Sequence, residues 1–172
     1  QYTYPCIVKP LESAKGDKRD ITICADVTAL SKCLKHYEEN GTTALIQEYI
    51  LSQTEISTMG VSFGPKKECR LPNVIVKERF SNKSATYAKV MPIAQRPDFA
   101  DTAEKIKQLI RSIGYTGIFD LDFLYSDGKY YFIELNLRNG AYGYGFTRGG
   151  LNFPADWCRY MLSGELPGQY EQ

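Results

Sequence analysis

Carboxylate, amide and guanidinium side chains alternate with apolar ones along two neighbouring segments, 118–125 and 130–137. Successive side chains of a β-strand point to opposite faces, so each segment can form a strand with one polar and one apolar face. Ser126-Asp127-Gly128 separates the segments and is typical of a hairpin turn. The polar side chains, with the residue that follows the second segment, are Asp120, Asp122, Glu134, Asn136 and Arg138.

Two carboxylates and one amide in this hairpin have the chemistry of a magnesium site. Asp122, Glu134 and Asn136 would supply the hard oxygen ligands that Mg²⁺ prefers. Arg138 would lie one pleat further along and hold a phosphoryl oxygen with its forked donors. A hairpin that carries both a metal site and a phosphate-binding arginine is suited to phosphoryl transfer. The competing interpretation is a solvated face with ion pairs between the strands.

The register of the hairpin decides whether these groups meet. Directly opposite residues of an antiparallel pair project to the same face, so Asp122 must lie opposite Glu134. A two-residue turn at Asp127-Gly128 would place the two carboxylates on opposite faces. We therefore predict a turn of three or five residues, since the alternative would turn Asp122 toward the core. The apolar faces, which we expect to pack into the core, are Phe119, Leu121 and Phe123, and Ile133, Leu135 and Leu137.

The rest of the chain predicts strands and helices in irregular order. The predicted strands are residues 4–10, 21–24, 44–50, 55–63 and 74–80, before the hairpin strands. A helix follows the N-cap Asp26, a second begins at Asp98 or Asp101, and a third spans 155–162 between Pro154 and Gly164. Residues 81–85 and the glycine-rich 139–150 are predicted loops. Without regular strand–helix alternation, the fold class is predicted to be α+β.

Composition excludes several classes of function. The chain has 172 residues, 43% hydrophobic and 24% charged, which fits one globular domain or two small subdomains. The net charge is only +1, whereas nucleic-acid-binding proteins have an excess of basic residues, so no nucleic-acid partner is expected. No apolar run approaches the roughly 20 residues of a membrane helix, so no membrane partner is expected. Five widely spaced cysteines and one histidine predict reduced thiols, a cytoplasmic location, and neither a histidine-based triad nor a histidine-rich metal site.

Several motifs resemble the ATP-grasp superfamily, of the carboxylate–amine or carboxylate–thiol ligase type, similar to the ATP-binding domain of the carbamoyl-phosphate synthase large subunit. G-I-F-D-L-D-F at 117–123 and D-G-K-Y-Y-F-I-E-L-N-L-R at 127–138 resemble its metal-binding hairpin. C-I-V-K-P at 6–10, S-A-K-G-D-K-R-D-I at 13–21 and L-I-Q-E-Y-I at 45–50 resemble its lysine strand, phosphate loop and adenine hinge. Leu137 stands where the family usually has proline.

The resemblance implies a role for each matching residue. Asp122, Glu134 and Asn136 would bind Mg²⁺ or Mn²⁺, and Arg138 would stabilise the transferring phosphoryl group. Lys9 would reach the α-phosphate of ATP, and Lys18, with Lys15 as its competitor, would be the lysine of the phosphate loop. The remaining nucleotide contacts would be Glu48, Tyr49 and Ile50 at adenine and Glu55 at the ribose.

The resemblance also implies an organisation and an activity. Residues 1–52 would form the small subdomain and 53–172 the large one, with the nucleotide between their sheets and a preceding N-terminal α/β domain missing. A substrate carboxylate would attack the γ-phosphate, giving ADP and an acyl-phosphate from which an amine or thiol displaces phosphate. The substrates would be small molecules, and the full-length protein a homodimer. Two alternatives stay open: a nucleotide-binding module without turnover, and a structural α+β domain. Residues 139–150, with Arg148, either border the carboxylate site or form a connector.

Overall fold

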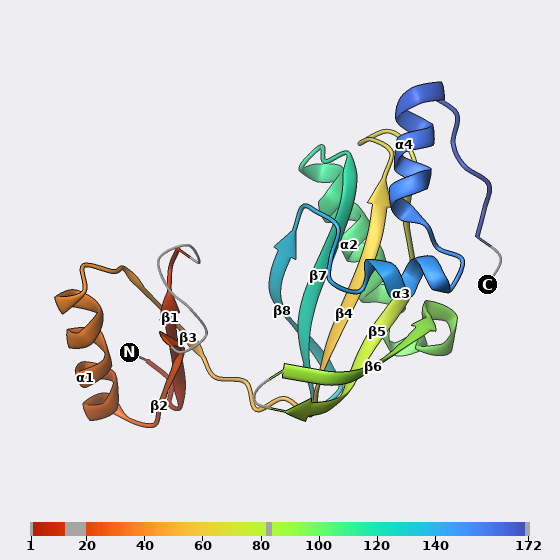
Figure 1. Ribbon diagram of the computed structural model, residues 1–172. Helices are drawn as coiled ribbons and strands as arrows, with labels where there is room; N and C mark the ends of the chain where they lie inside the picture. The colour runs from red at the N-terminus through yellow and green to blue at the C-terminus, as the bar shows by residue number, and fades with distance from the viewer. Residues whose placement is uncertain (1, 13–19, 82–83, 171–172) are drawn as a thin grey trace. The chain divides into compact units, whose positions relative to one another are not determined.

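The computed structural model describes residues 2–12, 20–81 and 84–170 (Figure 1). The chain divides into two compact units, Gln1–Leu51 and Ser52–Gln172, and each combines a sheet with helical structure. The predicted α+β fold class is therefore confirmed. Lys15 and Lys18, the two candidates for the loop lysine, lie outside the described residues.

Unit 1 is a three-stranded antiparallel sheet with one helix. Its strands are β1 (Cys6–Pro10), β2 (Thr22–Cys24) and β3 (Ala44–Glu48), in the order β2-β1-β3. The helix α1 (Val27–Glu39) packs on the sheet through Leu30 and Tyr37. Asp26 caps this helix as predicted, because its side chain accepts a hydrogen bond of 2.8 Å from the backbone N–H of Ala29.

Unit 2 is built on a five-stranded antiparallel sheet. Its strands are β4 (Thr54–Ser62), β5 (Cys69–Ser81), β6 (Ser84–Pro92), β7 (Gly117–Ser126) and β8 (Lys129–Asn136), in the order β6-β5-β4-β7-β8. Two short 3₁₀ helices, η3 (Ile93–Gln95) and η4 (Pro97–Phe99), lead from β6 into α2 (Ala100–Ser112). After the sheet come α3 (Gly143–Arg148) and α4 (Phe153–Ser163).

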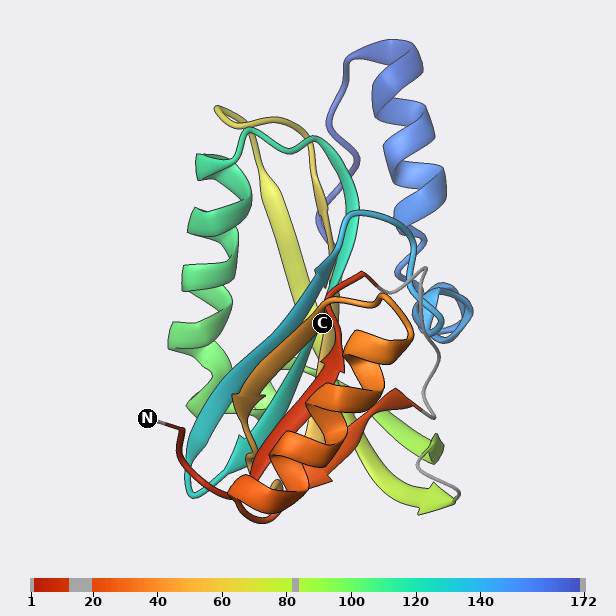
Figure 2. The same ribbon diagram turned by 90° about the vertical axis from the view of Figure 1, so that its left-hand side faces the viewer.

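Helices cover both faces of this larger sheet (Figure 2). On one face α2 inserts Ala103, Ile106 and Ile110 among residues such as Ile56 and Leu121. On the other face α3 and α4 contribute Phe146 and Phe153, which pack with Met59, Val61 and Ile75. Because β4 lies between the two layers, its last seven residues are all buried rather than alternately buried and exposed.

Four sequence predictions of local structure are corrected. β6 occupies a region where a loop at 81–85 and no strand were predicted, because this edge strand is formed by its antiparallel pairing with β5. The glycine-rich loop contains the helix α3, which the buried Phe146 anchors to the sheet. α2 begins after Phe99 and has no side-chain cap, so neither Asp98 nor Asp101 is its N-cap. β3 ends at Glu48 instead of residue 50.

The C-terminal segment of unit 2 is fastened by one arginine. The Arg70 guanidinium, 6% exposed, donates to the carbonyl oxygens of Pro167 and Gly168 at 2.6 Å each. It lies between the rings of Phe63 and Tyr170, whose centroids are 5.4 and 5.2 Å away. The segment that follows α4 is therefore part of the packed structure of unit 2.

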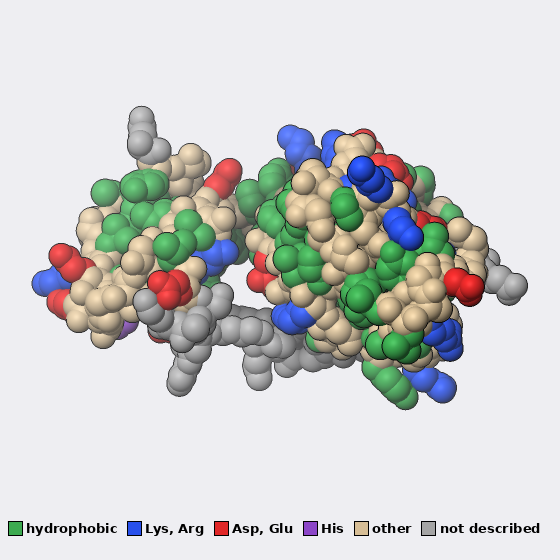
Figure 3. Space-filling model, turned by 90° about the horizontal axis from the view of Figure 1, so that it is seen from above, with side chains coloured by type: hydrophobic (Ala, Val, Ile, Leu, Met, Phe, Trp, Pro, Cys, Tyr) green, Lys and Arg blue, Asp and Glu red, His purple; other side chains and the backbone are tan. Residues whose placement is uncertain are grey.

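Charged side chains of both signs are interspersed on the visible face of unit 2 (Figure 3). This mixture agrees with the formal net charge of +1 and gives no broad region of one sign on that face. In the part of the chain that the structure describes, no helix has both the length and the apolar character needed to cross a membrane.

Candidate functional site

One face of the larger sheet changes from apolar to polar along its strands. Near α3, Met59 of β4 and Ile75 of β5 pack against Phe146. Two residues further toward the opposite end of each strand, the side chains on this face are Ser57 and Lys77. Strand periodicity thus places a polar surface directly beside the apolar layer that α3 covers.

A β-bulge places the two predicted metal-binding carboxylates opposite each other. Asp122 pairs with Glu134, whereas Phe123 pairs with Phe132, so Ile133 is one extra residue in β8. The turn between β7 and β8 has two residues, which makes the predicted three- or five-residue turn wrong. The predicted pairing of the carboxylates on one face is nevertheless confirmed, because the bulge supplies the one-residue shift that a longer turn would have given.

The apolar faces of the hairpin strands differ in burial. Those of β7, namely Phe119, Leu121 and Phe123, are at most 5% exposed, as predicted. In and after β8, Ile133 and Leu137 are 40% and 49% exposed, so the prediction that they pack into the core is wrong. Only Leu135 of that set packs against the core, because β8 is the edge strand and Ile133 lies in the bulge.

Lys77 of β5 connects two of the acidic residues. Its ammonium group donates to Glu55 Oε2 at 2.9 Å and to Asp122 Oδ1 at 3.2 Å. Ser57 also donates a hydrogen bond to Asp122 Oδ1. The side chain of Lys77 is only 12% exposed, and its positive charge offsets the negative charges of two partly exposed carboxylates.

The pKa of Lys77 is raised above its ordinary value. Burial lowers this pKa, but the hydrogen bond to Glu55 and the negative charge of Asp122 outweigh the cost of burial. Lys77 therefore stays positively charged through the physiological pH range. A fixed cation beside Asp122 is suited to binding a phosphate or a carboxylate.

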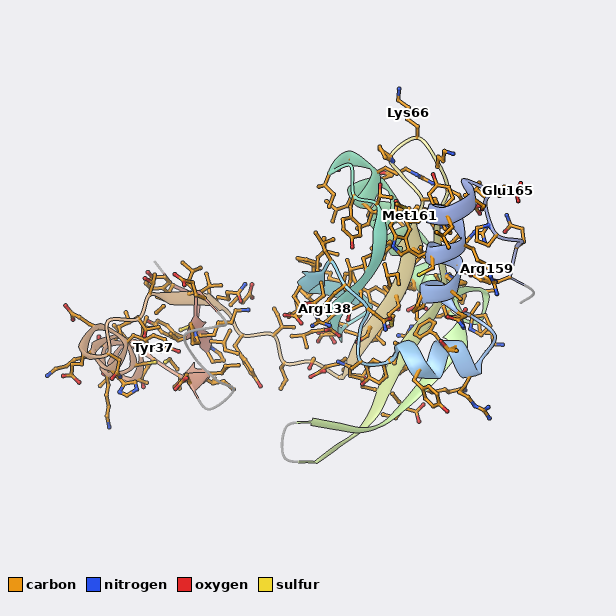
Figure 4. All side chains as sticks on the ribbon, turned by 45° about the horizontal axis from the view of Figure 1, so that its top comes forward. Tyr37, Lys66, Arg138, Arg159, Met161 and Glu165 are labelled. Atoms are coloured by element: carbon orange, nitrogen blue, oxygen red, sulfur yellow. The ribbon has the colours of Figure 1, made fainter. Side chains whose placement is uncertain are left out.

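Three polar side chains at the end of β8 form a hydrogen-bonded row. Asn136 Nδ2 donates to Glu134 Oε1 at 3.1 Å, and Arg138 Nη2 donates to Asn136 Oδ1 at 3.3 Å. Arg138 lies just beyond β8 and is exposed (Figure 4). The row places a guanidinium next to the amide and carboxylate oxygens predicted to bind the metal.

Asp120 is a buried carboxylate on the same face. It pairs with Asn136 across the hairpin and is 8% exposed, and its Oδ1 atom has no hydrogen-bond partner. Burial, followed by the negative charge of Asp122, raises the pKa of Asp120 to about 6. Gly140 lies so close that a Cβ atom there would be 2.6 Å from Asp120 Oδ2.

The donor set fits a divalent cation that prefers oxygen. Asp122, Glu134 and Asn136 offer two carboxylates and an amide, which together suit Mg²⁺ with water or phosphate completing its shell. Among the residues that the structure describes, no group of three or more His, Cys, Asp and Glu side chains is arranged to hold a metal. The amide of Asn136 is therefore an essential part of the proposed donor set, beside two carboxylates.

In unit 1, Lys9 and Glu48 lie on adjacent strands but on opposite faces of the sheet. Lys9 pairs with Leu45, and Cys6 pairs with Glu48. By strand alternation, the side chain near the end of β3 that shares a face with Lys9 is Gln47. Sequence reasoning did not identify Gln47, because the face that its side chain shares depends on the register between β1 and β3, which the local motif does not reveal.

In the predicted adenine hinge, residues 45–50, one backbone N–H group already donates a hydrogen bond within the protein. Tyr49 donates its backbone N–H to the carbonyl oxygen of Pro5 at 3.3 Å. Glu48 is exposed, whereas Tyr49 and Ile50 are half-buried. A small surface pocket of about 130 Å³ adjoins this region of unit 1. It is lined by Tyr2, Thr3, Cys6, Ile46, Gln47 and Glu48.

The larger site contains two residues that sequence reasoning missed. Ser57 and Lys77 come from β4 and β5, and both contact Asp122 on β7. Their contribution depends on the strand order β5-β4-β7, which local motifs do not reveal. Arg148, which was considered for the carboxylate site, is the last residue of α3.

Comparisons with known proteins agree on the fold. Residues 1–145 match the family model described as an ATP-grasp domain. A search of curated protein sequences gave no match. The chain is similar to a biotin carboxylase–β-γ-ATP complex from Campylobacter jejuni, with a TM-score of 0.78 and 19% identity over 97% of this chain and 39% of that chain.

Two further solved structures are similar. The biotin carboxylase domain of 2-oxoglutarate carboxylase from Hydrogenobacter thermophilus, a dimer with MgADP, ADP and bicarbonate, has a TM-score of 0.73 and 19% identity over 99% of this chain and 38% of that chain. N5-carboxyaminoimidazole synthetase from Staphylococcus aureus has a TM-score of 0.65 and 21% identity over 84% of this chain and 36% of that chain.

The chain spans about two fifths of the length of these solved chains. At such identities the structural similarity establishes a shared fold. The α+β architecture of the two units agrees with that fold. Since the family model extends over most of the sequence, this chain belongs to the ATP-grasp family.

Proposed function

We propose that this chain is the nucleotide-binding part of an ATP- and Mg²⁺-dependent ligase that activates a carboxylate as an acyl-phosphate. The observation that carries the proposal is the pairing of Asp122 with Glu134 beside Asn136 and Arg138, within an ATP-grasp domain. The solved relative from Hydrogenobacter thermophilus, which contains MgADP and bicarbonate, supports the same class of ligands.

Asp122, Glu134 and Asn136 are the proposed magnesium ligands, with Mn²⁺ as a substitute. The bound cation would neutralise charge on the phosphate oxygens and align the triphosphate. Glu134 and Asn136 are already hydrogen-bonded to each other, which limits the side-chain freedom that is lost on binding. Ser57 and Lys77 hold Asp122 in the same way from the neighbouring strands.

Arg138 and Lys77 are the proposed groups for the reacting phosphate and carboxylate. Arg138 is exposed beside Asn136, so its free donors can receive the oxygens of the phosphoryl group. The proposed reaction transfers the γ-phosphoryl group from ATP to a carboxylate oxygen, with ADP as the leaving group, and an amine or thiol then displaces phosphate from the acyl-phosphate. Lys77 would stabilise negative charge without giving up its proton, because its pKa is raised.

Unit 1 is proposed to bind the remainder of the nucleotide. Lys9 would contact the α-phosphate, and Lys18 or Lys15 would contact the phosphates from the segment between β1 and β2. Glu48, Tyr49 and Ile50 stay the predicted adenine contacts, and Gln47 joins them because it shares the face of Lys9. Since the Tyr49 N–H is bonded to Pro5, the backbone carbonyl groups of this segment are the better candidates for adenine. Glu55 stays the predicted ribose ligand in unit 2.

Isothermal titration of the chain with Mg-ATP tests the proposal. We expect binding to the natural sequence and its loss in Glu134→Ala, because a carboxylate ligand of the cation is removed. Glu165→Ala, which removes an exposed acid after α4, is the matched control and should bind as the natural sequence does. Equal binding by the natural sequence and Glu134→Ala, or binding by neither, would refute the metal assignment.

A nucleotide-binding module without ligase turnover is the alternative function. Phosphate release from ATP, measured over a panel of carboxylic acids with an amine present, separates the two functions. This assay belongs to the longer protein, because the present chain spans about two fifths of its solved relatives. Carboxylate-dependent phosphate release supports the ligase, and ATP binding without such release supports the module.

The partners of this activity are part of the same proposal. The substrates are small molecules carrying a carboxylate and an amine or thiol, and the 2-oxoglutarate carboxylase relative suggests a homodimer. The five cysteines are free thiols, which suits a cytoplasmic location.

A further inference from the structure

Three cysteine thiols lie together in unit 1, and the proposed ligase chemistry uses none of them. Cys6 of β1 lies directly opposite Cys24 of β2, so both side chains project to the same face of the sheet. Cys33 of α1 packs against the core cluster that contains them both. Cys33 and Cys6 are also the two neighbouring thiols that add to the raised pKa of the Cys24 thiol.

The three thiols differ in their access to solvent. Cys6 and Cys24 are 1% and 0% exposed, whereas Cys33 is half-buried on the helix. A small soluble oxidant therefore reaches Cys33 first. Cys24 lies beside it as a second thiol, which is the arrangement of a reactive cysteine next to a resolving cysteine.

We propose that Cys33 and Cys24 form a reversible redox site that closes to an intramolecular disulfide when a hydroperoxide oxidises it. The Cys33 thiolate attacks the peroxide, the O–O bond breaks, and Cys33 becomes a sulfenic acid while water or an alcohol leaves. The Cys24 sulfur then attacks Cys33, the S–O bond breaks, and water leaves. A dithiol restores both thiols and is itself oxidised to a disulfide.

The local structure can accommodate the bridge. β2 has only three residues and is an edge strand of the sheet, so it can shift slightly toward α1 without breaking pairs on a second side. Because Cys24 is buried and adjoins two other thiols, its pKa is raised to about 11. The resolving step therefore needs deprotonation of a weakly acidic thiol and accelerates as the pH rises.

The disulfide would fasten the edge strand to the helix of the unit that carries Lys9. β1, which holds Lys9, is the direct neighbour of β2 and contributes Cys6 to the same cluster. Oxidation would thus stiffen the small sheet from which the proposed phosphate contact projects. The disulfide itself does not depend on ATP binding, so the two proposals can fail separately.

The experiment uses this chain in a Cys158→Ser background, which removes the exposed thiol of α4. The protein is treated with hydrogen peroxide, unfolded, alkylated and weighed by mass spectrometry, and the bridge is located by peptide mapping. We expect the loss of two alkylatable thiols, a peptide pair joined through Cys24 and Cys33, and recovery of both thiols with dithiothreitol. No loss of paired thiols, a bridge to Cys6, or bridges only between molecules would overturn the proposal.

Three variants separate the roles of the thiols. Cys6→Ser should still form the bridge between Cys24 and Cys33. In Cys33→Ser we expect no loss of alkylatable thiols on treatment with peroxide. This variant should fold, because Cys33 is only half-buried. In Cys24→Ala, Cys33 should accumulate a sulfenic acid that dimedone traps, with circular dichroism confirming the fold. A folded Cys24→Ala that traps no dimedone at Cys33, or a bridging rate that does not rise with pH, contradicts the mechanism. Mg-ATP titration of the reduced protein reports on the proposed function independently.

Discussion

Asp122 and Glu134 face each other across the β7–β8 hairpin, although the turn that joins the strands has only two residues. The extra residue Ile133 in β8 supplies the one-residue shift in register that a tight two-residue turn lacks. Near the turn, the two strands follow the register of a tight hairpin, and beyond the bulge they follow one that is shifted by one residue. The proposed metal ligands therefore owe their common face to an irregularity within β8.

Two single-residue deletions in β8 should have opposite effects on Mg-ATP binding. Deleting Ile133 removes the bulge and still leaves Glu134 opposite Asp122, so binding should stay within a few-fold of the natural affinity. Deleting Leu135 moves Asn136 to the other face and should abolish detectable binding. Isothermal titration measures both, and circular dichroism checks the fold. Equal affinities in the two folded deletions would contradict the register argument.

Removing the buried cation should destabilise unit 2. In Lys77→Met, Glu55 and Asp122 lose their ammonium partner, and we expect a loss of about 1 to 3 kcal/mol in the free energy of unfolding, moderated because both acids are partly exposed. Urea denaturation measures this loss. Lys89→Met, which changes an exposed lysine of β6, is the control and should differ little from the natural protein. An unchanged unfolding midpoint in Lys77→Met would refute the assigned role.

Asp120 predicts a specific dependence of stability on pH. Its pKa in the folded protein, about 6, lies above its ordinary value of 3.8, so the folded state holds this proton more tightly than the unfolded state does. This contribution is fully present below pH 3.8 and is lost as the pH rises to about 6, a decrease of about 3 kcal/mol.

The variant Asp120→Asn isolates this contribution, because an amide does not titrate. Between pH 4 and pH 7, we expect the free energy of unfolding of Asp120→Asn to increase relative to that of the natural protein. Urea denaturation at several pH values measures this difference. A pH-independent difference would show that Asp120 titrates normally.

Gly140 should tolerate no side chain. A Cβ atom would meet Asp120 Oδ2 at 2.6 Å and Cγ at 2.9 Å, so Gly140→Ala must displace a buried carboxylate and should cost about 1 to 3 kcal/mol. In Gly145→Ala the new Cβ atom meets nothing within 4 Å, and the position lies in α3, so this control should be neutral or slightly stabilising. Thermal unfolding compares the two, and similar midpoints would contradict the close approach at Gly140.

Local patterns predicted the parts of the fold in which each residue's own chemistry decides. Asp26 caps α1 because its carboxylate reaches a free backbone N–H, and Gly164 ends α4 with a φ angle of 73° that glycine readily adopts. Phe119 and Leu121 are buried as their alternation with polar residues indicates. The pairing of Asp122 with Glu134 was also predictable, since it is required if neither carboxylate is to face the core.

Other features depend on neighbours that are distant in the sequence. The bulge at Ile133 replaces a longer turn, and turn residues alone do not distinguish the two solutions. Lys77 enters the site because β4 lies between β5 and β7, which is a property of the strand order. α3 forms in a glycine-rich segment because Phe146 finds a buried position on the sheet, a contact that outweighs the low helix propensity of glycine.

The bonds of Arg70 affect how this chain can be shortened. A chain that stops at the end of α4 would lose the carbonyl oxygens of Pro167 and Gly168, and a guanidinium that is 6% exposed would face solvent without those acceptors. The aromatic ring of Tyr170, which covers the cation, would be lost as well. A shortened chain that contains only residues 1–145, the range of the family match, would therefore lack these contacts of Arg70. Its yield on expression should fall because the fold is less stable, and not because the nucleotide site has changed.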